Sequence, residues 1–285
     1  MILQIGCFVF SIKSRIKCLA EAISSLYGDY ELADDSFIDF HVDLNVVNDV
    51  SRLFFRKKAV FLSDGFAPFD PLPYQHAPAL IEWGMNWCVS SQINTFLIIH
   101  AAVVEKHGYA VVMPAPPGSG KSTLTASLVQ EGWRLLSDEL TLVDLQTGSA
   151  TPFPRPISLK NESIDLIRCR YPKAVFGPLS SDTVKGSVCH VQPPTASVEM
   201  QHQSSPIGWV VFPKYQQGVE AELLNIGKAE TVMELADNSF NYSILATTGF
   251  NVLTDIVDQA DCYRFRYSRL DDAIAAFENL AHSKK

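Results

Sequence analysis

A glycine-rich stretch near the middle of the chain has the residue types that bind phosphate groups. Residues 115–122 read A-P-P-G-S-G-K-S, between an apolar run and a segment typical of a helix. This is the pattern G-x-x-x-x-G-K-[ST], with Ala115 in place of the first glycine. Backbone N–H groups at a helix start point at phosphate oxygens, and the helix dipole favours negative charge there. The sequence therefore predicts a nucleotide-binding loop.

Two side chains of this loop have defined chemical roles in nucleotide-binding proteins. The pattern predicts that Lys121 reaches the β- and γ-phosphates and that Ser122 ligates Mg²⁺. Ala115 is compatible with the loop if its φ stays below zero, where a side chain costs nothing. The expected nucleotide-binding residues are Pro117, Gly118, Ser119, Gly120, Lys121, Ser122 and Thr123.

A pair of acids follows the next apolar segment. Asp138 comes seventeen residues after Lys121 and is followed by Glu139, at the end of the apolar segment 133–136 (W-R-L-L). If that segment is a strand running in the same direction as the strand before the loop, both acids lie at the phosphate edge of the sheet. There they can supply a metal contact and a general base. The alternative is a solvated turn.

His100 is a third candidate for the site. A turn near His107 would fold residues 96–105 back on residues 109–113, which places residue 100 opposite about residue 114 and beside the loop. We expect His100 to hydrogen-bond Asp138 and to set its orientation and basicity. The alternative is a buried histidine with a structural role.

The hydrophobic pattern predicts an α/β fold that positions these residues in two parts. Residues 1–92 are expected to form a small N-terminal α/β unit, and residues 93–285 the nucleotide-binding domain with a helical C-terminal part. A capping box at 268–271 is expected to start the last helix. The expected strands are 2–12, 37–46, 59–62, 96–105, 109–113, 134–136 and 263–267, and the expected helices are 15–26, 79–89, 122–130, 229–236 and 250–259.

Composition excludes several classes of protein. The chain has 285 residues, of which 47% are hydrophobic and 19% charged, so a mostly disordered chain is excluded. A net charge of −8 argues against nucleic acid or an anionic membrane as the main partner. The sequence shows no secretory signal, no apolar run long enough to span a membrane and no C-x-x-C pair. We therefore expect a cytoplasmic location.

The chain resembles a known family of kinases. His100, residues 117–122 and residues 133–139 resemble the catalytic core of HPr kinase/phosphorylase. Over almost its whole length the chain resembles the HPr-kinase-related kinases of family A. The segments that carry this second resemblance are 82–88, 154–161 and 212–215. It implies a P-loop core similar to those of HPr kinase and phosphoenolpyruvate carboxykinase, with a small N-terminal α/β unit and C-terminal helices.

The resemblance also implies residue roles. Asp138 would be the base that takes the proton from an acceptor hydroxyl, and Lys121 would bind the phosphates. Ser122 and Glu139 would lie near the metal, although HPr kinases carry a second aspartate where this chain has Glu139. Arg155, with Lys160, would neutralise charge on the transferring phosphoryl group or bind the acceptor. The alternative for these two cations is a surface position near Glu162 and Asp165.

These expectations combine into a Mg-ATP-dependent kinase that phosphorylates a hydroxyl. The segment that HPr kinases use to dock HPr is not found, so serine of another peptide or small protein is the expected acceptor. The family resemblance places such proteins in peptide natural-product modification, with a PqqD-like carrier as a partner. The alternatives are a small-molecule kinase and a nucleotide-gated binding or scaffold protein, which would not need the pair His100–Asp138. Homo-oligomer formation and phosphorolysis stay open.

Overall fold

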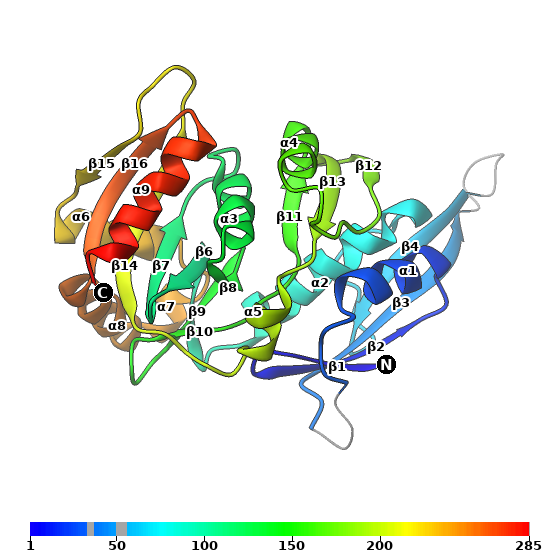
Figure 1. Cartoon of the computed structure of the whole chain (residues 1–285). Helices are drawn as coiled ribbons and strands as arrows, with labels where there is room; N and C mark the ends of the chain where they lie inside the picture. The colour runs from blue at the N-terminus through cyan, green and yellow to red at the C-terminus, as the bar shows by residue number, and fades with distance from the viewer. Residues whose placement is uncertain (33–36, 50–55, 285) are drawn as a thin grey trace.

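The computed structural model describes residues 1–32, 37–49 and 56–284. It is a mixed α/β structure with several sheets, as the sequence predicts (Figure 1). Within these residues no helix is long and apolar enough to cross a membrane.

The N-terminal sheet has the strand order β1-β2-β3-β4-β5 in the described part of the chain. The predicted single strand over residues 2–12 is wrong. Gly6 adopts a φ of +58° and lets the chain turn, so the segment forms the antiparallel hairpin β1–β2. The elements of this region are β1 (Ile2–Ile5), β2 (Phe8–Ser14), α1 (Lys17–Leu26), β3 (Phe40–Asp49), β4 (Arg56–Ser63), β5 (Leu72–Pro73), the 3₁₀ turn η1 (Tyr74–His76) and α2 (Ala77–Gln92).

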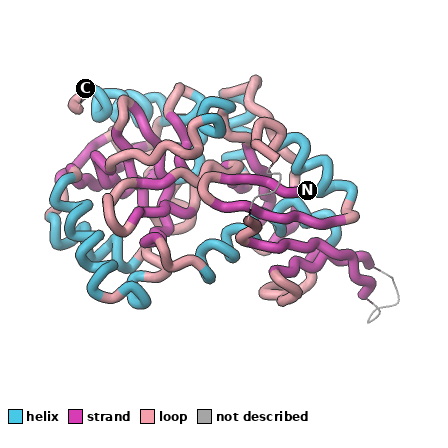
Figure 2. Tube along the Cα trace, turned by 90° about the horizontal axis from the view of Figure 1, so that it is seen from below, coloured by secondary structure: helices cyan, strands magenta, loops and turns pink. Residues whose placement is uncertain are grey.

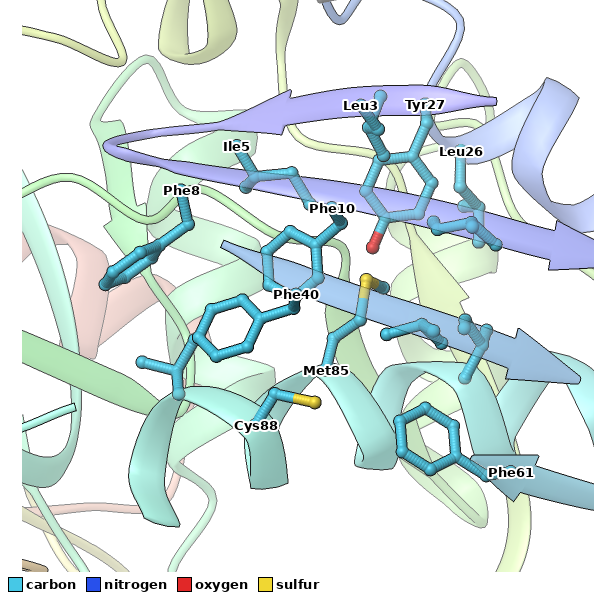
Figure 3. Packing of buried hydrophobic residues seen from close by; sticks show 14 of the residues in the cluster. Leu3, Ile5, Phe8, Phe10, Leu26, Tyr27, Phe40, Phe61, Met85 and Cys88 are labelled. Atoms are coloured by element: carbon cyan, nitrogen blue, oxygen red, sulfur yellow. The ribbon is translucent and has the colours of Figure 1, made fainter. Parts of the chain in front are cut away.

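Aromatic rings fill the core between this sheet and α2. Phe10 stacks on Phe40 with ring centroids 5.0 Å apart, and both rings are buried. Figure 3 shows Met85 and Cys88 of α2 facing these rings from below. Phe153, from much later in the chain, also packs against Phe8 and Phe10. The N-terminal sheet therefore shares its core with later residues, and the domain boundary at residues 92/93 stays a prediction.

The central sheet has the order β10-β9-β6-β7-β14-β16-β15, and β8 pairs with β6. Both β7 and β8 are antiparallel to β6, so they run in the same direction and end at the same edge. β14 and β16 are parallel to β7 and end there too. The strands are β6 (Phe96–Lys106), β7 (Tyr109–Pro114), β8 (Arg134–Ser137), β9 (Leu140–Asp144), β10 (Ala150–Thr151), β14 (Ile207–Tyr215), β15 (Glu222–Asn225) and β16 (Asp261–Tyr267).

Helices cover both faces of the central sheet (Figure 2). On one face lie α3 (Lys121–Gln130) and α9 (Leu270–His282), and on the other α6 (Lys228–Asp237), α7 (Tyr242–Leu245) and α8 (Thr247–Gln259). The predicted capping box is wrong, because Arg269 is the N-cap of α9 and makes no capping bond with its side chain. The Ser268 hydroxyl instead donates to the carbonyl of Val219 at 2.6 Å.

A smaller sheet lies between these two parts in Figure 1. Its order is β11-β13-β12, all antiparallel, among the described residues. β11 follows β9 and β10 in the chain and returns to the acid pair, where the backbone N–H of its residue Ser158 donates a hydrogen bond to Asp138. The elements are β11 (Ile157–Lys160), α4 (Glu162–Arg170), β12 (Ser180–Thr183) and β13 (Gly186–Val191), followed by α5 (Thr195–Glu199).

Candidate active site

The glycine-rich loop connects β7 to α3, as predicted. Gly118 and Gly120 have φ values of +84° and +87°, a region that favours glycine. Gly120 is also confined, because an added Cβ would lie 2.7 Å from the Tyr267 hydroxyl. Ala115 is not among the described residues with positive φ, which meets the condition set for it. The loop thus has the backbone shape that its sequence requires.

Lys121 is the first residue of α3 and is only 8% exposed. Its ammonium has no hydrogen-bond partner among the described residues, and neither does the buried hydroxyl of Ser119. Burial lowers the pKa of Lys121, while Asp138 and Glu139 oppose that change. The first N–H groups of α3 also have no carbonyl partner within the helix. Buried donors without acceptors cost free energy, so this arrangement fits an anionic ligand.

Asp138 follows β8 and is buried beside the loop. Its Oδ2 accepts hydrogen bonds from the Ser122 hydroxyl and from the Ser158 backbone N–H, both at 3.1 Å. Its Oδ1 is buried and has no hydrogen-bond partner among the described residues. The same is true of the Ser158 hydroxyl. Burial raises the pKa of Asp138 to about 6, against the lowering effect of Lys121. We call Ser119, Lys121, Asp138 and Ser158 the unpaired cluster.

Glu139 lies among positive charges. Burial acts to raise its pKa, but Lys121, Arg155, Lys160 and Lys185 outweigh that effect and lower it. Its carboxylate accepts a hydrogen bond from the side-chain amide of Asn86 on α2. The Ser122 hydroxyl bonds to Asp138 rather than to Glu139.

His100 does not make the predicted hydrogen bond to Asp138. Ala101, not His100, pairs with Pro114, and His100 pairs with Leu140 on β9. Its ring packs against Phe240, with centroids 5.8 Å apart, and Asp138 takes its hydrogen bonds from Ser122 and Ser158 instead. Burial, with help from Lys121, lowers the pKa of His100 to about 4. His100 is therefore near the site but neutral, and it does not orient the aspartate.

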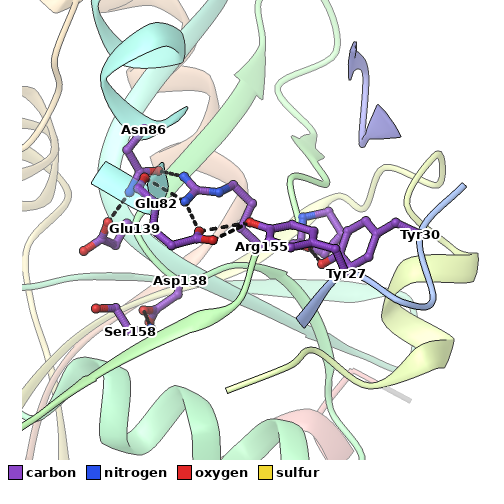
Figure 4. A network of polar contacts seen from close by, with 9 residues as sticks. Tyr27, Tyr30, Glu82, Asn86, Asp138, Glu139, Arg155 and Ser158 are labelled. Carbon is purple, nitrogen blue, oxygen red and sulfur yellow. Dashed lines mark hydrogen bonds and ion pairs between the residues drawn. The ribbon is translucent and has the colours of Figure 1, made fainter. Parts of the chain in front are cut away.

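Arg155 is buried, so the alternative of a surface cation is wrong for it. Only 6% of the residue is exposed, and its guanidinium forms an ion pair with Glu82 of α2. It also donates to the Glu82 carbonyl at 2.8 Å and to the side-chain oxygen of Asn86. The Nε of Arg155 has no partner among the described residues. Since Asn86 in turn bonds to Glu139, the chain of contacts runs from Arg155 to the acid pair (Figure 4).

The same chain of contacts reaches Tyr27, the residue that directly follows α1. The Tyr27 hydroxyl lies 2.8 Å and 3.0 Å from the two carboxylate oxygens of Glu82. We call Tyr27, Glu82, Asn86, Arg155 and Glu139 the paired network. From the sequence, residues 82–88 were assigned only to an expected helix and to a family resemblance. Polar side chains four residues apart in an apolar helix were the available signal, because they share one helix face.

Two lysines and a tryptophan lie beside the acid pair. The Lys185 ammonium lies 4.8 Å from the centre of the Trp83 ring, a cation–π contact. Lys160 and Lys185 both act on the pKa values of Glu139 and His100, which places them around one space. A pocket at this point is lined by Trp83, Asp138, Glu139, Ser158 and the buried His190, among others. Trp83, Ser158 and His190 were not predicted as site residues.

Comparisons with known proteins add little to this description. No protein-family model and no curated protein matches the chain. Among solved structures it is similar to the HPr(Ser) kinase/phosphatase from Coxiella burnetii, with 9% sequence identity and a TM-score of 0.29. The match covers 65% of this chain and 98% of that chain. A likeness this distant carries no argument, so the function must be argued from the site itself.

Proposed function

We propose that the protein is a Mg-ATP-dependent phosphotransferase with a hydroxyl acceptor. The observation that carries this proposal is the buried Lys121 ammonium, which has no partner in the described chain and lies at the start of α3 behind a glycine-rich loop. The β- and γ-phosphates would give acceptors to Lys121, to the Ser119 hydroxyl and to the first N–H groups of α3. A structural lysine would have an ion-pair partner of its own.

Asp138 is the proposed base. The acceptor hydroxyl oxygen bonds to the γ-phosphorus while the bond from that phosphorus to the bridging oxygen of ADP breaks. The hydroxyl proton goes to Oδ1 of Asp138, the oxygen that has no partner among the described residues. A pKa of about 6 leaves this carboxyl ionised at neutral pH, yet more basic than an ordinary aspartate.

Oxygen ligands from Ser122 and Glu139 fit Mg²⁺, which prefers hydroxyl, carboxylate and phosphate oxygens. A bound Mg²⁺ would neutralise charge on the phosphates. Around it, Lys121 and Lys160 would stabilise negative charge on the transferring group, and both act on the pKa of Glu139. Arg155 would influence the transferring phosphoryl group only through its positive charge and without a direct contact, because its guanidinium is already paired with Glu82.

The acceptor we propose is serine of a peptide or small protein, with a PqqD-like carrier as a partner, and the family resemblance supports this choice. A nucleotide-gated binding protein is a second candidate, for a specific reason. The contact expected to separate the two functions was the His100–Asp138 hydrogen bond, and that bond does not form. Only a test for transfer distinguishes them.

The test uses ATP labelled at the γ-phosphate, with Mg²⁺ and an extract of the native cells. Wild type, Lys121→Ala and Asp138→Asn are compared, with exposed Asp255→Asn as the matched control for the aspartate. We expect a labelled product with wild type and the control, no ATP binding with Lys121→Ala, and binding without transfer with Asp138→Asn. ATP binding by wild type with no labelled product from any extract would favour the nucleotide-gated protein.

A further inference from the structure

A groove of about 1040 Å³ lies along the outer side of the glycine-rich loop. Gly118, Gly120 and Thr123 line one wall, and residues of α4 and of the start of α9 line the other. Its volume is that of a pocket for a small molecule. We propose that this groove binds the nucleoside part of the nucleotide, with the base stacked on Tyr215. This inference rests on the proposed function.

The sheet topology explains why an aromatic side chain lies beside the loop. β7, β14 and β16 are parallel and end at one edge, the edge where ligands bind in open α/β sheets. Tyr215 is the last residue of β14, and its backbone N–H donates to the Ser119 carbonyl at 2.9 Å. Tyr267 ends β16, and its hydroxyl donates to the Gly120 carbonyl at 3.3 Å.

The two tyrosines differ in exposure. Tyr267 is 1% exposed and supports the loop from inside. Tyr215 is 50% exposed and meets Tyr267 edge-to-face, with ring centroids 5.9 Å apart. An edge-to-face contact uses at most one face of the Tyr215 ring and leaves the other face free of Tyr267. A base can stack on such a surface whatever its identity.

Charge gives the nucleotide a direction. The wall far from the loop carries three acids, Glu162, Asp165 and Asp271, against two cations, Arg170 and Arg269, and Arg170 is paired with Asp271 at 2.5 Å. Carboxylates repel phosphate but accept hydrogen bonds from ribose hydroxyls and base amino groups. The phosphates would therefore lie toward Lys121. Ser122 faces Asp138, whereas Thr123, the next residue, lines the groove, so the terminal phosphate and the nucleoside point to opposite sides of the loop.

The experiment compares Mg-ATP with inorganic tripolyphosphate, which has the phosphates but no nucleoside. Titration calorimetry is carried out on wild type, Tyr215→Ala, Tyr215→Phe and Lys121→Ala, with Phe250→Ala as the control for loss of an exposed aromatic ring. We expect Tyr215→Ala to weaken ATP binding roughly 5- to 150-fold, the range for loss of one stacked base. Tripolyphosphate binding stays unchanged in that variant, and Tyr215→Phe and Phe250→Ala bind both ligands as wild type does.

Three results would overturn the inference. Unchanged ATP binding by Tyr215→Ala places the nucleoside elsewhere and leaves the proposed function standing. An equal loss of tripolyphosphate binding shows that Tyr215 only supports the loop. Failure of wild type to bind either ligand removes the phosphate site, and the proposed function with it. When both proposals hold, Lys121→Ala is the only variant tested that loses binding of both Mg-ATP and tripolyphosphate.

Discussion

The unpaired cluster is buried, the paired network is buried except at the half-buried Asn86 and Glu139, and the two meet at the acid pair. They differ in whether their polar groups have partners in the chain. In the paired network the guanidinium of Arg155 bonds to the Glu82 carboxylate and to the Asn86 side-chain oxygen, and the Asn86 amide nitrogen donates to Glu139. In the unpaired cluster four polar atoms have no partner among the described residues. These atoms are Ser119 Oγ, Lys121 Nζ, Asp138 Oδ1 and Ser158 Oγ.

This difference separates structural from ligand-binding roles. Buried polar groups in folded proteins are nearly always hydrogen-bonded, so a set of adjacent exceptions needs an explanation. Chain contacts satisfy most of the paired network, in which Arg155 Nε is the one buried side-chain atom without a partner among the described residues, so this network holds the acid pair against α2 and Tyr27. A ligand that brings both acceptors and a proton donor would satisfy the unpaired cluster. A phosphorylated nucleotide with a hydroxyl acceptor has those groups.

The largest effect on stability is expected from Arg155→Met. The substitution leaves the buried Glu82 carboxylate without its cation, and loss of one partner of a buried ion pair costs about 3–5 kcal/mol. Urea unfolding measures this change. The double variant Arg155→Met with Glu82→Leu removes both charges and should recover most of the loss. If the single variant is as stable as wild type, the network does not hold the fold together.

Asn86→Leu is expected to have the next largest effect. It leaves one carboxylate oxygen of Glu139 and one nitrogen of Arg155 without a partner, at a cost of about 1–3 kcal/mol in the free energy of unfolding. Because Glu139 also loses its orientation, the Mg²⁺ concentration needed for transfer should rise. Asn86→Asp places a carboxylate beside Glu139 and should be worse still. An unchanged Mg²⁺ dependence in both variants would separate Asn86 from the metal site.

Ser158→Ala is expected to change stability least. The contact with Asp138 uses the backbone N–H of residue 158, which the substitution keeps, and the hydroxyl has no partner. The free energy of unfolding should change by less than about 0.5 kcal/mol in the absence of ligand. A loss of about 2 kcal/mol would show that this hydroxyl is satisfied, and the contrast between the two regions would not hold there.

Local sequence patterns predicted the parts of this structure that depend on neighbours in the chain. The glycine-rich loop and the helix after it follow from the residue types, with the helix expected over 122–130 and found over Lys121–Gln130. So does the position of Asp138 directly after β8, because an apolar run sets where that strand ends. The elements that failed were those with a competing local signal, such as Gly6 inside an apolar run.

Contacts between distant residues could not be predicted in the same way. The partner of Arg155 is Glu82, 73 residues earlier, and no spacing rule connects an irregular segment with a helix face. The position of His100 depended on hairpin register, where a difference of one residue moves a side chain to the other face of the sheet. Burial of Arg155 and the missing bond from His100 to Asp138 thus required the three-dimensional structure.

Lys121→Met tests the central claim most directly, because it probes stability and ligand binding at one buried position. Unfolding in urea and Mg-ATP titration are measured on wild type, on Lys121→Met and on exposed Lys13→Met as a control. We predict that wild type and the control bind Mg-ATP, and that Lys121→Met does not bind it although it is at least as stable as wild type without ligand. Binding of Mg-ATP by Lys121→Met, or a loss of stability as large as that of Arg155→Met, would contradict the assignment of Lys121 to a ligand.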